Sequence, residues 1–327
     1  MKVLVTGADG MLGSNIVREL LQRRHQVRAF VLPDSPYRSL DGLAIEKAAG
    51  NLLQASDLAQ ACQGCDAVIH AAANTNIWPD RSEMVRKVNI DGTQNLIAVA
   101  LAQNIQRLVY IGTANSFGFG SKTAPGDETR PYQSAKYGLD YMDSKYEAQQ
   151  RLLRACREQG LPALTINPTF MLGPYDSKPG AGAMILAIYQ QKVPGYAVGG
   201  RNYIYVKDVA VAVCNALQQG RIGESYIAGN ANLNYQEAFS LIAETVGVKA
   251  PRIFIPPAIS KAYGFLGSQW GRLTGKAPTV SYAMASISCD AHYFSAQKAV
   301  EELGLPQTDI KIAIRESFDW LKANGYC

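Results

Sequence analysis

The chain has 327 residues, of which 47% are hydrophobic and 18% charged, so it can bury a large core and is not a disordered protein. Its 32 basic and 27 acidic side chains give a small net charge of +5, and the absence of any basic run excludes a dedicated nucleic-acid-binding protein. No apolar run approaches the roughly 18 residues that cross a membrane, and the first residues are too poor in apolar side chains for a signal peptide. We therefore expect a cytoplasmic protein with no nucleic-acid or membrane partner.

Cysteine and histidine are too scattered to indicate a metal centre. Cys62 and Cys65 form a C-x-x-C pair, but no second pair follows at the spacing of a zinc site, and the three histidines are far apart. We expect no bound metal and interpret residues 62–65 as a helix end and a turn. The dispersed cysteines are typical of a reducing compartment such as the cytoplasm.

Strand and helix patterns alternate along the first half of the chain. Short apolar runs predict strands at residues 2–6, 26–32, 67–71, 106–113 and 161–167. Apolar residues at helical spacing predict helices at residues 11–22, 83–103 and 141–159. Strands that are apolar throughout are buried on both faces, so this alternation predicts an α/β fold with a doubly wound parallel sheet of the Rossmann type.

A smaller second α/β domain is expected after residue 168. About 150 residues per domain predicts two domains for this length, and prolines punctuate the sequence from Pro168 onward. We predict a nucleotide-binding domain over residues 1–168, to which residues 202–224 return. The predicted substrate domain comprises residues 169–201 and 225–327.

A glycine-rich loop lies between the first predicted strand and the first predicted helix. Residues 7–13 read GADGMLG, which places Gly7, Gly10 and Gly13 in a G-x-x-G-x-x-G pattern. Glycine lets the backbone turn tightly and approach a diphosphate, and the following helix offers free N–H groups and a positive dipole to the anion. The loop predicts binding of a dinucleotide cofactor.

The end of the second predicted strand indicates which dinucleotide is preferred. An NAD site usually places a carboxylate there for the ribose hydroxyls. Here the strand ends with Phe30, Val31 and Leu32, Asp34 comes only after a proline, and Arg38 could meet a 2′-phosphate. We expect NADP, with NAD as the alternative.

Tyr141 and Lys145 form a Y-x-x-x-K pattern at the start of a predicted helix. Their i, i+4 spacing places both side chains on one helix face. Since an ammonium group favours a nearby phenolate, we expect Lys145 to lower the pKa of Tyr141, which could then exchange a proton with an alcohol or ketone oxygen near neutral pH. Thr113, at the end of a predicted strand, could hydrogen-bond the same oxygen.

A second Y-x-x-x-K pattern, formed by Tyr132 and Lys136, competes with the first. It follows Pro131 and is soon interrupted by Gly138, so we expect no continuous helix there. Tyr141 begins an uninterrupted helical stretch, and we therefore assign the proton transfer to Tyr141.

Together these patterns resemble the extended branch of the short-chain dehydrogenase/reductase superfamily, which includes the NAD-dependent epimerase/dehydratase family. Within it, the chain most resembles bacterial dihydroflavonol 4-reductase-like and hopanoid-associated sugar epimerase-like proteins. Further stretches agree along essentially the whole chain: residues 68–73 (VIHAAA), 89–95 (NIDGTQN), 172–174 (LGP), 201–208 (RNYIYVKD) and 298–304 (KAVEELG). Residues 50–52 depart slightly, because they read GNL where the family usually has GDL to hold the adenine.

The resemblance implies a role for each matching residue. Tyr141 would be the acid/base and Lys145 its pKa modifier and ribose ligand, with Thr113 binding the carbonyl oxygen and Asn89 supporting the lysine through water. Substrate contacts are expected from Thr113, Phe170 and Arg201. The implied cofactor contacts are Gly7, Gly10, Met11, Leu12, Gly13, Arg38, Asn51, Leu52, Ala71, Ala72, Ala73, Tyr141, Lys145, Asn167, Pro168 and Phe170. The resemblance also implies a homodimer through the helices that begin at residues 83 and 141.

Three functions of different kinds remain open for a small-molecule substrate. The first is an NAD(P)-dependent oxidoreductase that reduces a fairly apolar ketone or aldehyde, which Phe170 favours because sugar-nucleotide enzymes tend to have a diphosphate-binding asparagine there. The second is a nucleotide-sugar epimerase or dehydratase with recycled NAD(P), which Arg201 favours because such enzymes use an arginine there. The third is a nucleotide sensor without activity, which the intact Thr113, Tyr141 and Lys145 disfavour. We predict the reductase.

Overall fold

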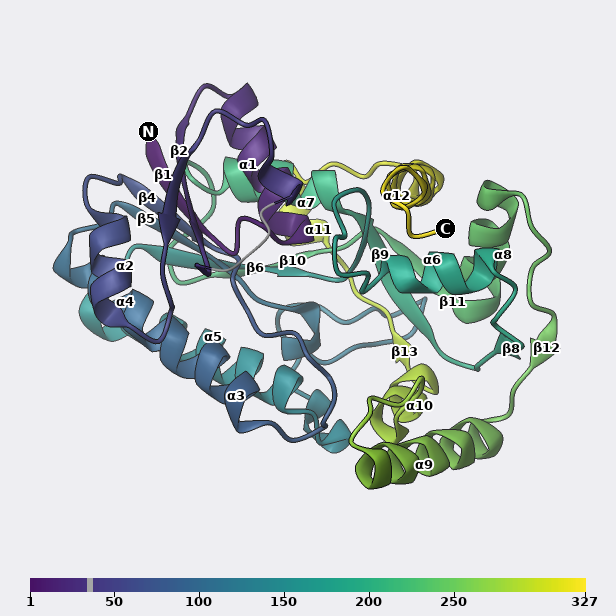
Figure 1. The fold of residues 1–327 in the computed structure, drawn as a ribbon. Helices are drawn as coiled ribbons and strands as arrows, with labels where there is room; N and C mark the ends of the chain where they lie inside the picture. The colour runs from purple at the N-terminus through teal and green to yellow at the C-terminus, as the bar shows by residue number, and fades with distance from the viewer. Residues whose placement is uncertain (34–37) are drawn as a thin grey trace.

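The computed structural model describes residues 1–33 and 38–327, and only the backbone of Arg38 (Figure 1). Its larger part is a seven-stranded sheet in the order β10-β6-β5-β4-β1-β2-β3, with every neighbouring pair parallel. This arrangement confirms the predicted Rossmann-type sheet. Its strands are β1 (Lys2–Thr6), β2 (Gln26–Val31), β3 (Glu46–Ala49), β4 (Ala67–His70), β5 (Arg107–Ile111), β6 (Ala163–Pro168) and β10 (Ser225–Ala228).

Helices cover both faces of this sheet, because alternate residues of each strand point to opposite sides. In β1, Val3 and Val5 enter a core shared with α1 (Met11–Gln22), α7 (Val206–Asn215) and α11 (Gln297–Leu303). Leu4 enters a separate core on the other face. That core contains side chains of α2 (Ala55–Cys62), α4 (Gly92–Ala102) and α5 (Asp140–Gln159). Figure 1 shows the two groups of helices on opposite sides of the strands.

The helix predicted at residues 83–103 contains a wider turn. α3 (Glu83–Arg86) continues through a π-helical segment (Lys87–Asp91) into α4. Such inserted turns occur mostly as single bulges and frequently at functional sites. Asn89 lies in this turn, with its side chain buried.

A smaller sheet is built around β9 (Gly200–Tyr205). It pairs with β7 (Phe170–Leu172), β11 (Ala231–Asn234) and β13 (Ala291–His292). A separate parallel pair is formed by β8 (Gly195–Tyr196) and β12 (Ile253–Phe254). The helices of this part are α6 (Gly182–Tyr189), α8 (Tyr235–Val246), α9 (Pro257–Thr274), α10 (Tyr282–Ser288) and α12 (Ile310–Ala323). Elsewhere in the described residues, short 3₁₀ helices are formed by Arg38–Leu40, Ala114–Ser116 and Ser134–Tyr137.

We predicted that residues 202–224 return to the first domain. The strand pairing places both boundaries of this returning segment at other residues. β9, which ends at Tyr205, lies in the smaller sheet, whereas α7 packs against α1 and β10 pairs with β6. α7 thus connects the smaller sheet, at β9, with the larger sheet, at β10. We therefore propose that residues 206–228 form the returning segment.

None of the helices in the described residues is long and apolar enough to cross a membrane. The described residues also contain no group of three or more His, Cys, Asp or Glu side chains placed to hold a metal ion.

Candidate functional site

The glycine loop joins β1 to α1 at the carboxyl end of the sheet, where the strand order reverses. β1 pairs with β2 on one side and β4 on the other, and parallel sheets bind ligands at such a switch point. Gly7 has a φ angle of 63°, and a Cβ atom there would lie 2.6 Å from Cα of Ala72. A Cβ atom on Gly13 would lie 2.0 Å from the carbonyl oxygen of Gly7. Both positions therefore require glycine.

The start of α1 fits the diphosphate of a dinucleotide. Its N-cap is Gly10, which has no side chain to satisfy the first N–H groups, and its first turn contains no acidic residue. Free N–H groups and the helix dipole attract an anion. The N–H groups of Ala71 and Ala72 donate to Thr6, which holds this segment beside the loop. The structure thus brings together the predicted cofactor residues Gly7, Gly10, Met11, Leu12, Gly13, Ala71, Ala72 and Ala73.

The remaining predicted cofactor residues lie on separate segments. Asn51 is exposed and accepts a hydrogen bond from the N–H of Leu53, and the carbonyl oxygen of Leu52 accepts one from Asn95. Asn167 and Pro168 end β6, and Oδ1 of Asn167 is buried without a hydrogen-bond partner among the described residues. The side chain of Arg38 lies outside the described part of the chain.

Thr113 and Tyr141 lie together, as predicted. Thr113 follows β5 and accepts a hydrogen bond from the N–H of Asn115 at 3.3 Å. Burial raises the pKa of Tyr141, and a hydrogen bond to the Thr113 hydroxyl offsets part of that rise. Tyr141 therefore keeps its proton at neutral pH, which suits a group that donates a proton to a substrate oxygen.

Lys145 lies one turn further along α5 and is almost completely buried. Its Nζ donates to the carbonyl oxygen of Ile111 at 2.6 Å and lies 4.3 Å from the centre of the Tyr110 ring. Burial lowers the pKa of Lys145 to about 7. Burial dominates the pKa shifts of both groups, and the Lys145 ammonium is directed at Ile111, so the lowering of the Tyr141 pKa by Lys145 stays a prediction.

Asn89 ties the segment after β4 to α5. Its Oδ1 accepts from the N–H of Asn74 at 2.8 Å, and its Nδ2 donates to the carbonyl oxygen of Asn74 and to the hydroxyl of Ser144. Ser144 in turn donates to the carbonyl oxygen of Tyr141 at 3.1 Å. Asn89 thus holds the helix turn that carries Tyr141, while its water-mediated contact with Lys145 stays a prediction.

The competing pair, Tyr132 and Lys136, is engaged with other partners. Tyr132 donates to Asp143 at 2.6 Å and stacks on Tyr146 with 4.3 Å between ring centres. Lys136 lies in a 3₁₀ helix and pairs with Asp290 at 2.7 Å. The two side chains therefore do not form a tyrosine–lysine pair.

A polar group beside Thr113 was not predicted from the sequence. Nδ1 of His292 lies 3.2 Å from Oδ1 of Asn115, and Nε2 lies 2.9 Å from the hydroxyl oxygen of Tyr137, whose hydrogen is donated to Asp290. Burial, with the charge of Arg201 as a second cause, lowers the pKa of His292 to about 3, so this ring is neutral. With only three histidines in the chain, each is a candidate site residue from the sequence alone. Only the fold, however, brings His292 next to Asn115.

Phe170 and Arg201, the substrate residues predicted on the smaller sheet, lie next to this group. The guanidinium carbon of Arg201 lies 5.0 Å from the centre of the Phe170 ring, and Arg201 is opposite His292 in the pairing of β9 with β13. Nε of Arg201 donates to the hydroxyl of Tyr235 at 2.9 Å. Among the described residues, no acidic side chain pairs with Arg201 within 4.0 Å.

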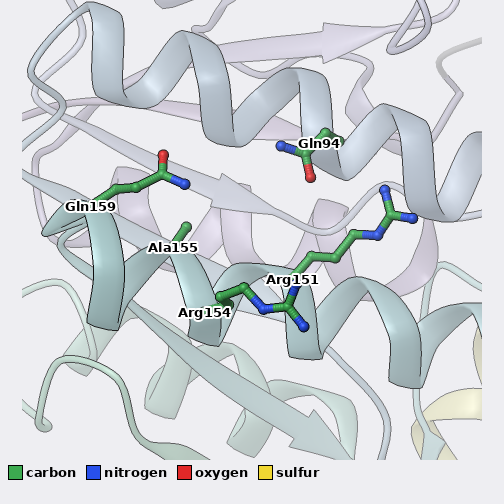
Figure 2. Close-up of a pocket in the computed structure, with 5 residues that line it drawn as sticks. All are labelled: Gln94, Arg151, Arg154, Ala155 and Gln159. Carbon is green, nitrogen blue, oxygen red and sulfur yellow. The ribbon is translucent and has the colours of Figure 1, made fainter.

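A cavity between α4 and α5 is a separate feature (Figure 2). It has a volume of about 310 Å³ and is lined by Gln94, Arg151, Arg154, Ala155 and Gln159. None of these residues was predicted for the site, and those on α5 follow Tyr141 by more than two helical turns. The cavity therefore is not where Thr113 and Tyr141 meet.

Comparisons with known proteins agree with this geometry. The sequence model of the NAD dependent epimerase/dehydratase family matches residues 3–229. The chain is 34% identical over 329 aligned positions to a Synechocystis sp. protein named "Putative dihydroflavonol 4-reductase", covering 98% of this chain and 95% of that protein. It is 28% identical over 331 positions to "Sterol demethylase protein B" of Methylococcus capsulatus, covering 99% of each.

A solved structure of a nucleoside-diphosphate-sugar epimerase from Pseudomonas aeruginosa matches with a TM-score of 0.82 at 27% identity. The match covers 100% of this chain and 99% of that one. With the glycine loop at the switch point and Tyr141 beside Thr113, the chain belongs to the NAD dependent epimerase/dehydratase family, the extended short-chain dehydrogenases/reductases, and is an NAD(P)-dependent oxidoreductase.

Proposed function

We propose that the protein reduces a ketone or aldehyde, and the placement of Tyr141 beside Thr113 is the observation that carries this proposal. The dinucleotide, when bound by the glycine loop and the start of α1, supplies the hydride for the carbonyl carbon. Thr113 orients the substrate oxygen, and Tyr141 donates its phenolic proton to that oxygen. Asn89 and Ser144 hold the turn of α5 that carries Tyr141.

Apolar side chains around Tyr141 support an apolar substrate. Tyr141 packs at the margin of a cluster formed by Tyr137, Leu139, Met142, Ala283 and Ile287. The Phe170 ring packs edge-on against Tyr203 at 5.5 Å, and a phenyl ring offers no hydrogen bond to a diphosphate. The relatives named as a dihydroflavonol reductase and a sterol demethylase protein are consistent with this choice.

The preferred cofactor in this proposal is NADPH. β2 ends at Val31 without a carboxylate, and the sequence offers Arg38 for a 2′-phosphate. A charge-assisted hydrogen bond contributes about 1.5–3 kcal/mol, so Arg38→Ala should weaken NADPH binding at least tenfold, to the level of NADH. Fluorescence titration with both cofactors measures this, and tighter binding of NADH to the unmodified protein would contradict the preference.

Arg201 supports a second candidate function, a nucleotide-sugar epimerase or dehydratase. Its guanidinium has no acidic partner within 4.0 Å among the described residues, so it is available for an anionic substrate group such as a diphosphate. The epimerase from Pseudomonas aeruginosa is a relative with that name. In such an enzyme the cofactor would be oxidised and reduced within one turnover.

Absorbance of NADPH during incubation with a mixed substrate panel tests the proposal. The panel holds apolar ketones and aldehydes, flavanonols, steroids and nucleotide sugars. Steady consumption of NADPH with a carbonyl compound is the expected result. Conversion of a nucleotide sugar with no net change in cofactor would instead establish the epimerase or dehydratase and make Arg201 a substrate residue.

Tyr141→Phe tests the proton transfer within the same assay. Loss of a positioned general acid should lower kcat by roughly 10²–10⁴-fold, with the cofactor still bound. Tyr132→Phe is the matched control, because it removes a tyrosine hydroxyl from the competing pattern. Near-normal turnover by Tyr141→Phe would contradict the assignment, as would a comparable loss in Tyr132→Phe.

We also propose that the protein forms a homodimer through α3, α4 and α5, and the cavity of Figure 2 lies between the last two of these helices. Light scattering should give twice the mass of one 35.4 kDa chain. A mass of one chain at micromolar concentration would contradict this interface.

The cytoplasm is the proposed compartment. All six cysteines are free thiols, which fits a reducing environment. Recovery of the protein in an exported fraction of cells would contradict this location.

A further inference from the structure

The outward face of α9 carries a continuous apolar stripe. Its five residues are spaced alternately by four and three positions, which places them on one side of a helix. Their exposed fractions run from 58% to 85%. The stripe consists of Ile259, Tyr263, Leu266, Trp270 and Leu273. Figure 1 shows α9 at the outer edge of the molecule, with α10 on its inner side.

An amphipathic helix usually turns its large apolar side chains toward the core. α9 has the opposite orientation. Its buried residues are Gly264, Ser268 and Gly271. A Cβ atom on Gly264 would lie 2.6 Å from Cβ of Ala285, and one on Gly271 would lie 2.6 Å from the Trp78 ring. The small residues therefore hold α9 closely against the protein while its large ones face solvent.

This segment concentrates the exposed apolar surface of the molecule. Nine of the sixteen exposed large hydrophobic side chains in the described residues lie between Ile253 and Tyr282. Soluble single chains rarely expose such contiguous apolar patches unless they bind a partner.

A longer stretch around this segment, residues 245–289, carries the net charge of the chain. Residues 245–289 contain five basic side chains and no acidic one, and the rest of the chain holds 27 of each sign. All five are exposed, and none is in an ion pair within 4.0 Å in the described part of the chain. They are Lys249, Arg252, Lys261, Arg272 and Lys276.

We propose that this face of α9 binds the surface of a lipid bilayer that contains anionic lipids. The apolar stripe would enter the boundary between headgroups and acyl chains, where tryptophan and tyrosine are favoured, and the basic side chains would meet lipid phosphates. No spanning helix is needed for binding of this kind, so the absence of an apolar run long enough to cross a membrane does not bear on it.

A second copy of the chain fits this face less well. A symmetric interface brings the same patch of two subunits together. Because residues 245–289 contain no acidic side chain, this segment of one copy supplies no countercharge to the five basic groups of the other, and Asp80, which interacts with Arg272, is a single carboxylate beside them. An anionic surface supplies that countercharge.

Binding through α9 would bring the apolar cluster beside Tyr141 close to the lipid. α10 packs on α9, and its Ala283 and Ile287 belong to the apolar cluster at whose margin Tyr141 lies. A lipid-soluble ketone would then cross only the α9–α10 layer to reach Tyr141. This consequence rests on the proposed reductase function, whereas the membrane binding itself does not.

Sedimentation with lipid vesicles tests the proposal on the full chain. The protein should sediment with vesicles of phosphatidylcholine and phosphatidylglycerol, and much less with phosphatidylcholine alone. The double variant Leu266→Ser/Trp270→Ser should bind roughly a hundredfold more weakly, because each buried side chain contributes roughly a factor of ten. Lys261→Gln/Lys276→Gln should lose about fivefold per charge, and only toward the anionic vesicles.

Ile312→Ser is the matched control, because it removes an exposed apolar side chain from α12. Its vesicle binding should equal that of the unmodified protein, and urea unfolding should show all variants folded. The proposal is overturned if the unmodified protein does not sediment with anionic vesicles, or if Leu266→Ser/Trp270→Ser sediments equally well. It is also overturned if the only effect of Leu266→Ser/Trp270→Ser is to convert a dimer into single chains, as measured by light scattering, because the stripe would then bind a second copy. NADPH consumption with a water-soluble carbonyl compound is measured separately, so a failure of the reductase function is recognised independently.

Discussion

At the scale of single residues, Lys145 carries a buried charge. Its pKa falls from 10.5 in water to about 7 because burial disfavours the ammonium form. Below pH 7 the lysine is charged in both the folded and the unfolded chain, so burying the charge lowers the free energy of unfolding by its full amount. Between pH 7 and 10.5 the unfolded chain binds more protons, so stability rises with pH over this range.

Lys145→Met should therefore stabilise the fold most at low pH. The shift corresponds to roughly 5 kcal/mol as an upper limit, reduced by the lost hydrogen bond to Ile111. Urea unfolding at about pH 6 and about pH 10 measures the difference between variant and parent, which should shrink at the higher pH. Lys192→Met, at an exposed position, is the control and should show no such trend. An equal effect of Lys145→Met at both pH values would refute the buried-charge explanation.

At the scale of elements, the β1–loop–α1 unit depends on the contact between Gly13 and Gly7. Gly13→Ala would place a methyl group 2.0 Å from the carbonyl oxygen of Gly7, and neither atom belongs to a flexible side chain. We expect a destabilisation of about 1–3 kcal/mol from overpacking, together with loss of NADPH binding as the loop shifts. Urea unfolding and fluorescence titration measure the two effects.

Gly180→Ala is the matched glycine control, since its added methyl group would meet no atom within 4 Å. It should bind NADPH normally. Unchanged NADPH binding by Gly13→Ala would argue against the glycine loop as the diphosphate site.

At the scale of the whole molecule, two histidines are buried in neutral form, one on a strand of each sheet: His70 on β4 and His292 on β13. Burial lowers the pKa of His70 and of His292 from 6.5 to about 3. Above pH 6.5 both rings are neutral in the folded and the unfolded chain. As the pH falls from 6.5 toward 3, the histidines take up protons in the unfolded chain but not in the folded one, so the free energy of unfolding decreases. Each histidine should remove about 1.4 kcal/mol per pH unit in this window.

Urea unfolding at about pH 7 and about pH 5 should show this loss, and His70→Gln/His292→Gln should reduce it. A free energy of unfolding that stays constant between these values would contradict the neutral burial of both rings.

The fold shows which elements short-range patterns can predict. β1 and α1 match the predicted ranges, because a run of three apolar residues within a β-rich segment and a helical apolar period are local signals. β3 was missed because it is a largely exposed edge strand of sequence EKAA. The π turn at Asn89 was also missed, since it interrupts a helical pattern without breaking it.

The sequence by itself determined the class of fold, the glycine loop, and the spacing of Tyr141 and Lys145 on one helix face, because each depends on residue type and spacing over a few positions. Only the tertiary structure decided that Asn115, Tyr137 and His292 join Thr113, since those segments are separated by up to 177 residues. It also decided the burial of Tyr141 and Lys145, which shifts their pKa values, and the outward face of α9. Desolvation and exposure are properties of the packed molecule, and a spacing pattern does not contain them.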